Sequence, residues 1–242
     1  MSILDELLAN LVGDAPVRTI LVGAHWTVVC SRHCGLASTV FSDSPHGQDQ
    51  VRAVGRLHLK SGRELAEYAR SDNTLEASIG LAALNSLLEV DEGQAVELNA
   101  IEVLAKQGQA KNVVLVGHFP FIPRLRQAAG QLWVIEQNPL PDEYPAEAAS
   151  QLIPQAEVVA VTGTALLNHT LDNLLSLCRP EALVMVLGPT TPLTPVLFDY
   201  GVTIISGARV IDEAAVLRTV GQGATFRQVE GAQLLTLTRP EC

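Results

Sequence analysis

Residues 96–242 alternate between short, continuously apolar runs and longer segments whose apolar residues recur with a helical period. This alternation is typical of a parallel sheet that helices cover on both faces, because strands buried on both sides carry few polar residues. The pattern therefore predicts an α/β fold with a Rossmann-like, doubly wound, mainly parallel sheet. The expected strands are 112–117, 132–138, 157–163, 182–188 and 202–207, the expected helices are 120–129, 144–156, 165–178, 194–201 and 212–223, and residues 233–238 are an expected edge strand.

The first part of the chain follows a different order, with β-rich runs placed between helical segments. Ser61 with Glu64, and Asn73 with Glu76, have the spacing of a capping box, in which two side chains each accept a hydrogen bond from the backbone N–H of the other residue. These pairs mark the starts of two helices and predict a small α+β unit. Its expected elements are a helix within 1–14, β-rich runs at 17–31 and 34–41, and helices at 61–71 and 73–89.

The charge-rich segment 89–99 separates the two patterns. We expect a domain boundary there, with an α+β domain at residues 1–95 and an α/β domain at residues 96–242. The helix before it, 73–89, is apolar almost all round and should be buried. Asn85 within that helix then needs a hydrogen-bonding partner, so it either satisfies the core or contributes to a ligand site.

Charge and composition narrow the classes of partner. The chain has 16 lysine and arginine residues against 26 acidic ones, a formal net charge of −10, which disfavours sequence-independent binding to nucleic acid. No apolar run approaches the about 18 residues of a membrane span. Asp5 and Glu6 lie where a secretory signal would be basic, so a cytoplasmic location is expected. The expected partner is a small molecule or a metal ion. Binding to nucleic acid or to a membrane is not expected. Formation of a homo-oligomer is left open.

Cys30, His33 and Cys34 cluster in the segment CSRHC. The spacing is not that of a C-x-x-C knuckle, and no second Cys/His pair completes a tetrahedral site. Four cysteines in the whole chain are also too few and too scattered for a disulfide framework. A structural role for Cys30 and Cys34, as small residues in strands, is therefore the favoured interpretation, with metal binding as the alternative.

Small, polar or ionisable residues follow every expected strand of the α/β half. One such loop is ordinary turn chemistry, but in a doubly wound sheet all of these loops meet at the carboxyl edge, where ligands bind. We therefore expect a ligand site there. The candidate residues are Gly117, His118, Phe119, Glu136, Thr162, Gly163, Thr164, Asn168, Gly188, Pro189, Thr190, Thr191, Gly207 and, from the first half, Asn85.

His118 and Glu136 carry most of the reactive chemistry among these candidates. An imidazole carries protons or binds metals near neutral pH, and a carboxylate can pair with it, bind a metal or act as a base. Both residues are therefore candidates for catalytic groups and for metal ligands. The chain lacks a G-x-G-x-x-G sequence after the first strand of this half, a Walker loop and a G-x-S-x-G elbow, which disfavours an ordinary NAD dehydrogenase, P-loop ATPase or α/β-hydrolase.

Five segments are distinctive when taken together: GHFPF (117–121), VVAVTGTALLNHTLDNLL (158–175), VLGPTTPLTPVLFDYGV (186–202), ISGARVID (205–212) and, in the first half, IGLAALNS (79–86). These segments resemble the heavy-metal chelation family, in which an enolase N-terminal-like domain precedes a Rossmann-like domain. The resemblance extends over the whole chain and implies a ligand site between the two domains, with a heavy-metal ion as the candidate cofactor.

Three functions are compatible with these features. The first is a two-domain protein that binds a metal, or a metal-containing or anionic small molecule, in the cleft between domains. The second is an enzyme that acts on a small anionic metabolite with His118 and Glu136 as an acid–base pair. The third is a nucleotide binder without the usual glycine signature.

Overall fold

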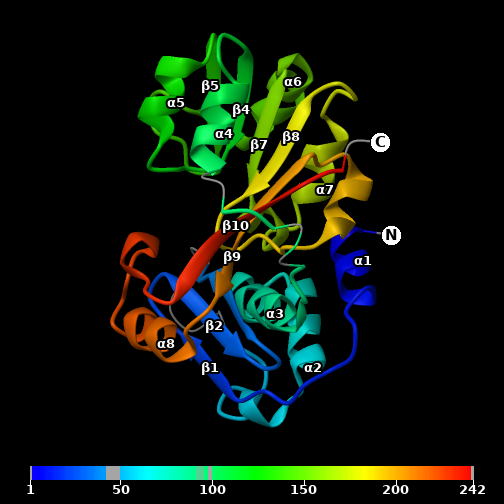
Figure 1. Ribbon diagram of the computed structural model, residues 1–242, viewed down its shortest axis with the longest axis vertical. Helices are drawn as coiled ribbons and strands as arrows, with labels where there is room; N and C mark the ends of the chain where they lie inside the picture. Colours follow the sequence, from blue (N-terminus) through cyan, green and yellow to red (C-terminus); the bar gives the residue numbers. More distant parts are fainter. Residues whose placement is uncertain (1, 42–49, 92, 94, 98–99, 241–242) are drawn as a thin grey trace.

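The computed structural model describes residues 2–41, 50–91, 93, 95–97 and 100–240. A seven-stranded sheet and a three-stranded sheet form its framework, the first above the second in Figure 1. The elements are α1 (Ile3–Ala9), β1 (Thr19–Val22), β2 (Trp26–Cys30), β3 (Cys34–Ser38), η1 (Leu57–Leu59), α2 (Gly62–Ala66), η2 (Glu67–Arg70), α3 (Thr74–Leu87), α4 (Ala100–Gln107), β4 (Asn112–Val116), α5 (Ile122–Ala128), β5 (Gln131–Glu136), β6 (Tyr144–Pro145), η3 (Ala146–Ala148), α6 (Ala149–Leu152), η4 (Ile153–Gln155), β7 (Val158–Thr162), η5 (Gly163–Leu166), α7 (Leu171–Ser176), β8 (Leu183–Leu187), η6 (Pro195–Tyr200), β9 (Ile204–Val210), α8 (Glu213–Gly221), η7 (Phe226–Gln228) and β10 (Ala232–Thr238).

The large sheet has the strand order β10-β9-β8-β7-β4-β5-β6. Every neighbouring pair is parallel except β9 and β10, where the edge strand β10 runs antiparallel. The first strand of this sheet in the chain, β4, pairs with β5 on one side and β7 on the other, so the order reverses between β4 and β7. The expected mainly parallel α/β sheet and the expected edge strand are confirmed, and the structure adds that this edge strand is antiparallel.

Apolar layers cover both faces of this sheet, which explains why its strands are continuously apolar. On one face, Val113 and Leu115 pack with Leu104 of α4 and Leu125 of α5. The alternate residues of the same strands, such as Val114, face the other layer, which includes α6, α7 and η6. Because successive residues of a strand point to opposite faces, burial on both sides requires an uninterrupted apolar run.

The small sheet is antiparallel, in the order β1-β2-β3, and it is also covered on both faces. Helix α3 lies against β2 and β3 on one face. Helix α8, which follows β9 late in the chain, covers the other face, where Val216 and Val220 pack with Val28 and Leu36 (Figure 1). The two helices that cover the small sheet are thus far apart in the sequence, α3 at residues 74–87 and α8 at residues 213–221. The boundary expected at residues 95 and 96 stays a prediction, and residues 92, 94, 98 and 99 around it lie outside the described part.

The capping box predicted at the start of α2 forms, whereas the one predicted at the start of α3 forms only in part. Ser61 and Glu64 form the expected capping box at the start of α2. At α3, Asn73 accepts hydrogen bonds from two backbone N–H groups of the first turn, as expected for an N-cap. Glu76, however, does not complete a capping box, because its carboxylate binds Arg52 and Ser71 instead.

The expected helix at 165–178 is divided into η5 and α7. The interruption is at His169, whose φ of +56° lies in the left-handed region that a continuous right-handed helix excludes. The helical period of the sequence gives no sign of this break, because the apolar residues on both sides of it are buried. The break matters for the position of Asn168, described below.

A buried carboxylate, Glu76, links α3 to the segment before α2. Its side chain is 3% exposed and accepts hydrogen bonds from the Arg52 guanidinium at 2.9 Å and from the Ser71 hydroxyl at 2.7 Å. Burial alone would raise the pKa of Glu76, but the hydrogen bonds from Arg52 and Ser71 outweigh it and hold this pKa below its ordinary value. A lowered pKa in the folded state stabilises the fold above the unfolded pKa, and this contribution disappears as the pH falls through the folded value.

We therefore expect Glu76→Gln to lower the free energy of unfolding by about 2 kcal/mol at neutral pH, the scale of hydrogen bonds to a buried charged group. The difference from the wild type should shrink as the pH falls below about 4.3, the ordinary glutamate value, because the wild-type carboxylate then also becomes neutral. Urea denaturation at several pH values measures both effects. Glu67→Gln, which alters an exposed ion pair with Arg70, is the matched control and should change stability by less than about 0.5 kcal/mol. A difference for Glu76→Gln that stays constant down to acid pH would contradict this account.

No helix in the described part of the chain has the length and apolar character needed to cross a lipid bilayer.

Candidate functional site

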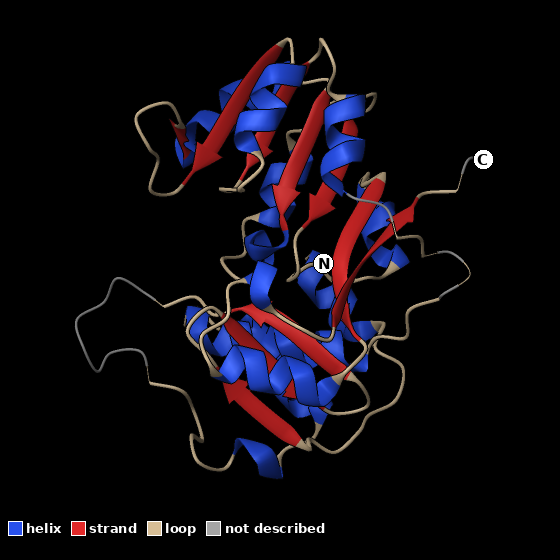
Figure 2. Ribbon diagram, turned by 60° about the vertical axis from the view of Figure 1, so that its left-hand side comes forward, coloured by secondary structure: helices blue, strands red, loops and turns tan. Residues whose placement is uncertain are grey.

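A cavity of about 490 Å³ lies at the carboxyl ends of the large sheet's parallel strands, on the side that faces the smaller unit. Figure 2 shows these strands running toward the small sheet. The cavity is lined by residues at or just after the ends of β4, β5, β7 and β8, and by residues of β9, β10, α4, the small sheet and the segment after α8. The predicted site residues that line it are Gly117, His118, Phe119, Glu136, Thr162, Thr164, Gly188, Pro189 and Thr190.

Two glycines turn the backbone away from the sheet at this edge. Gly117 follows β4 and Gly188 follows β8, and each has a φ of +111°, a conformation that side-chain-bearing residues rarely adopt. At Gly117 a Cβ would also lie 2.9 Å from the side chain of Thr162. These glycines therefore let the chain leave the sheet sharply, which places the residues that follow, such as His118, at the mouth of the cavity.

His118 is held by a carboxylate, but this carboxylate belongs to Glu143, not to the expected partner Glu136. The imidazole Nδ1 lies 2.9 Å from Glu143 Oε1, and the other oxygen of Glu143 accepts a hydrogen bond from the backbone N–H of Leu140. An ionised carboxylate only accepts hydrogen bonds, so Nδ1 carries the proton and the neutral imidazole has its lone pair on Nε2. A carboxylate that fixes this tautomer is typical of histidines that bind metals or act as bases.

Glu136 and a pair of threonines add oxygen atoms to the same edge. Glu136, at the end of β5, is half-buried and accepts a hydrogen bond from the N–H of Gln137. The hydroxyls of Thr162, the last residue of β7, and Thr164 lie 2.9 Å apart. These groups supply acceptors and donors at the switch point of the sheet, which is the usual place for a ligand in this class of fold.

Thr190 joins the exit loop of β8 to the small sheet. Its hydroxyl accepts a hydrogen bond from the Ser38 N–H, and its carbonyl oxygen accepts one from Asn85 Nδ2, which also donates to the carbonyl oxygen of Leu36. Thr190 is fully buried. The amide of Asn85 therefore has partners in the core, as its position in an apolar helix requires, and it also fixes one wall of the cavity.

Aromatic side chains cover much of the remaining wall. Trp26 of the small sheet packs edge-on against Phe226, with ring centroids 5.4 Å apart, and Phe119 stacks on Phe121 at 4.9 Å. Arg227 adds a cation next to Phe226. The indole Nε1 of Trp26 is buried and has no hydrogen-bond partner among the described residues. Because a buried indole N–H usually has a partner, this donor is suited to an acceptor on a bound ligand.

Other predicted residues lie outside this cavity. Gly163 and Gly207 pack around Thr191: a Cβ at Gly163 would lie 2.4 Å from the Thr191 hydroxyl, and one at Gly207 would lie 2.5 Å from its carbonyl oxygen. Thr191 and Asn85 line a separate cavity of about 80 Å³, and the Asn85 side-chain oxygen and the Thr191 hydroxyl have no partner among the described residues. Asn168 is exposed, and its oxygen accepts hydrogen bonds from Thr170 because the helix breaks at this point.

Sequence reasoning did not identify Trp26, Glu143, Phe226 or Arg227. Glu143 precedes β6 by one residue, but only the folded loop after β5 brings it back to His118. Trp26 and Phe226 come from opposite ends of the chain and meet because α8 and η7 return to the small sheet. No local pattern in the sequence signals either contact.

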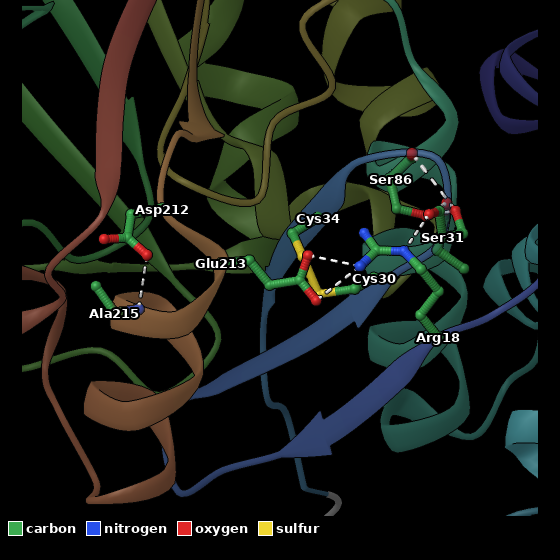
Figure 3. Close-up of a disulfide and its surroundings, with 9 residues drawn as sticks. Arg18, Cys30, Ser31, Cys34, Ser86, Asp212, Glu213 and Ala215 are labelled. Carbon is green, nitrogen blue, oxygen red and sulfur yellow. Dashed lines mark hydrogen bonds and ion pairs between the residues drawn. A yellow bond between two sulfur atoms is a disulfide. The ribbon is translucent and has the colours of Figure 1, made fainter.

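A second cluster of possible metal ligands lies in the small sheet. Cys30 and Cys34 are directly opposite each other across the β2–β3 hairpin and form a disulfide, which the sequence interpretation did not anticipate (Figure 3). Their sulfur atoms and a carboxylate oxygen of Glu213 all lie within 4.8 Å of one another. In the described part of the chain this is the one group of three histidine, cysteine or acidic residues close enough to hold a metal, so His118 and Glu136 lack a third such ligand.

The fold and the cavity together define an α/β protein with a polar and aromatic cavity at the carboxyl edge of its large sheet. A family model described as "Putative heavy-metal chelation" matches residues 99–239, and a second with the same description matches residues 4–88. The chain belongs to this heavy-metal chelation family, as the resemblance in the sequence implied.

Three similar proteins extend this comparison without adding an activity. The chain is 29% identical, over 175 residues that make up 68% of each chain, to an uncharacterized protein of Methanocaldococcus jannaschii. The crystal structure of a protein with unknown function from the DUF364 family of Desulfitobacterium hafniense is similar to it, with a TM-score of 0.85 and 27% identity over 98% of both chains. A DUF364 protein of unknown function from Pyrococcus horikoshii has a TM-score of 0.82 and 20% identity, also over 98% of both chains, and this likeness concerns the fold.

Proposed function

We propose that the cavity of about 490 Å³ at the carboxyl edge (the large cavity) binds a metal ion that is already held by a small, planar, anionic chelator. The observation that carries this proposal is the combination, in one cavity, of an oriented histidine with aromatic walls and an unpartnered indole donor. A ligand with both a metal centre and an organic body would use all three features. The role of His118 and Glu136 as metal ligands is part of this proposal.

The number of protein ligands is the first argument for a chelate over a bare ion. His118 and Glu136 are the protein groups at the cavity that suit a transition metal, since imidazole and carboxylate bind such ions well. No third histidine, cysteine or acidic residue of the described chain completes a cluster with them. A bare ion usually needs three or four protein ligands, so the remaining positions would be filled by the chelator.

The lining of the cavity is the second argument. Apolar and aromatic walls with a few convergent polar groups are typical of sites for small organic molecules. The rings of Trp26, Phe119 and Phe226 favour a flat body, and Arg227 and the Trp26 N–H favour negatively charged oxygen atoms on it.

A second candidate function is acid–base chemistry on a small anionic metabolite. The contact between His118 and Glu143 favours it, because a carboxylate that fixes the imidazole tautomer is also how a general base is oriented. Glu143, not Glu136, would then be the partner of His118. The two functions differ in whether the ligand needs a metal.

Intrinsic fluorescence provides a direct test, because the chain has two tryptophans and Trp26 lines the cavity. We expect the complex of Ni²⁺ with pyridine-2,6-dicarboxylate, a planar anionic chelator that leaves part of the metal sphere open, to quench the fluorescence of Trp26. Neither Ni²⁺ nor the free chelator should do so at the same concentration.

The variant Trp26→Phe, which retains Trp133, is the matched control and should show little quenching. Equal quenching by Ni²⁺ alone would indicate a simple metal site, and equal quenching by the free chelator would favour the metabolite enzyme. Quenching by the complex that persists in Trp26→Phe would place the chelate elsewhere and contradict the proposal.

A further inference from the structure

We propose that Cys30 and Cys34, once reduced, form with Glu213 a second metal site that takes a soft divalent cation, so that the disulfide is the closed state of a redox-gated site. This site is separate from the large cavity, whose lining includes none of the three residues. It would give the chain a thiolate ligand set, which the His118 site lacks.

The fold, and not the sequence spacing, assembles the ligands. Cys30 ends β2 and Cys34 begins β3, and the hairpin register places them opposite each other. Glu213 lies in the first turn of α8, and the packing of α8 on the small sheet brings its carboxylate to the sulfur atoms. Thiolates favour soft and borderline cations such as Cd²⁺ and Zn²⁺, and a carboxylate oxygen is an accepted third ligand for them.

Arg18 positions Glu213 and balances the charge. Its guanidinium donates to both carboxylate oxygens of Glu213, at 2.9 and 2.7 Å, and to the carbonyl oxygen of Ser31 (Figure 3). One carboxylate oxygen can therefore turn to a metal while the other remains bound to Arg18, as is usual for groups that orient metal ligands. Two thiolates, one carboxylate, one guanidinium and one divalent cation sum to zero charge, so the site selects a divalent ion over a monovalent one.

The disulfide is converted into the metal-binding pair of thiols by a two-electron reduction. A dithiol reductant breaks the S–S bond between Cys30 and Cys34, gives two electrons and two protons to the sulfur atoms, and is itself oxidised to a disulfide. The cation then forms two S–metal bonds and one O–metal bond and releases the two thiol protons to solvent. With three protein ligands, a tetrahedral ion keeps one position open for water or an external thiol, which suits transfer of the cation to and from the site.

A small cavity lies next to the Cys30–Cys34 pair. The cavity of about 80 Å³ is lined by Cys34 together with Asn85 and Thr191. The cavity is large enough to hold water, and next to it the Asn85 side-chain oxygen and the Thr191 hydroxyl have no hydrogen-bond partner among the described residues. Cys178, by contrast, lies apart from any such cluster, and burial raises the pKa of its thiol to about 11, so it stays protonated at neutral pH.

The experiment uses the full chain carrying Cys178→Ser and Cys242→Ser, so that Cys30 and Cys34 are its remaining cysteines. Cd²⁺ is titrated into the oxidised protein, and into protein reduced with a phosphine that is then removed. We expect the reduced form to bind one Cd²⁺ per chain, with an ultraviolet thiolate-to-cadmium charge-transfer band and release of about two protons. The oxidised form should show no such band. Circular dichroism of the reduced protein should match that of the oxidised protein.

Two substitutions, each of which removes one carboxylate charge, test whether Glu213 is the third ligand. Glu213→Gln should lower the Cd²⁺ affinity of the reduced protein by at least about tenfold. Glu89→Gln, which alters an exposed carboxylate near the same hairpin, should leave the affinity unchanged. The proposal is overturned if the reduced protein shows no charge-transfer band, if reduction unfolds it, or if Glu213→Gln binds Cd²⁺ as tightly as its parent. The outcome does not depend on the large cavity, because His118→Asn should leave this band unchanged.

Discussion

His118→Asn is expected to keep the fold and to weaken binding of the Ni²⁺–dicarboxylate complex in the large cavity by at least about tenfold, the scale on which metal sites respond to loss of their ligand geometry. Asparagine retains polarity but has no nitrogen lone pair in the place of Nε2. The loss should appear as a shift of the Trp26 quenching curve to higher concentrations.

His169→Asn is the matched control for this substitution. His169 lies outside the cavity at a φ of +56°, a conformation that asparagine tolerates well, so binding should be unaffected. Glu143→Gln should have an intermediate effect, since the amide oxygen can still accept a hydrogen bond from Nδ1 but no longer carries a charge. Wild-type affinity in His118→Asn would exclude the imidazole from ligand binding and leave it as a residue that shapes the loop.

The sequence predicted the large sheet well because its signals are local. Strand β4 is continuously apolar from Val113 to Val116, which follows from burial on both faces, and the segments between the strands have a helical period. The position of α8 could not be predicted in the same way. Val216 and Val220 indicate an apolar helical face, but nothing in the sequence states that this face covers the small sheet instead of the large one. Long-range packing of this kind depends on the whole fold.

The residues of the candidate site likewise fall into those that the sequence predicted and those that only long-range packing brings together. The rule that ligands collect at the carboxyl edge of parallel strands was enough to bring His118, Glu136 and Thr162 to one cavity. The rule says nothing about which side chains come from outside the sheet, so Trp26 and Glu143 were missed. The pairing of Cys30 with Cys34 was missed for a related reason: the sequence places them in two separate β-rich runs but does not give the hairpin register that sets them directly opposite each other.

Gly35→Ala is expected to have the largest effect on stability of the substitutions considered, because β3 approaches α3 with no room for a side chain. A Cβ at Gly35 would lie 2.0 Å from the carbonyl oxygen of Ala82 and 2.4 Å from the backbone N–H nitrogen of Ser86. Both neighbours are backbone atoms of α3, so no side-chain rotation relieves the contact, and the sheet and the helix must move apart. Overpacking of a core costs about 1–3 kcal/mol, and a contact with helix backbone belongs at the upper end of that range.

A loss of about 3 kcal/mol corresponds to a fall in Tm of roughly 6–12 °C for a chain of this size, which differential scanning calorimetry measures. Gly221→Ala is the control: a Cβ there would lie 3.6 Å from Leu21, an ordinary contact, and alanine favours the end of α8, so Tm should stay level or rise slightly. Ligand binding should fall as well in Gly35→Ala, because the same displacement moves Asn85, which is bonded to Thr190 at the cavity wall. An unchanged Tm would show that β3 and α3 do not approach this closely, and would therefore remove the support that this wall gives to the site.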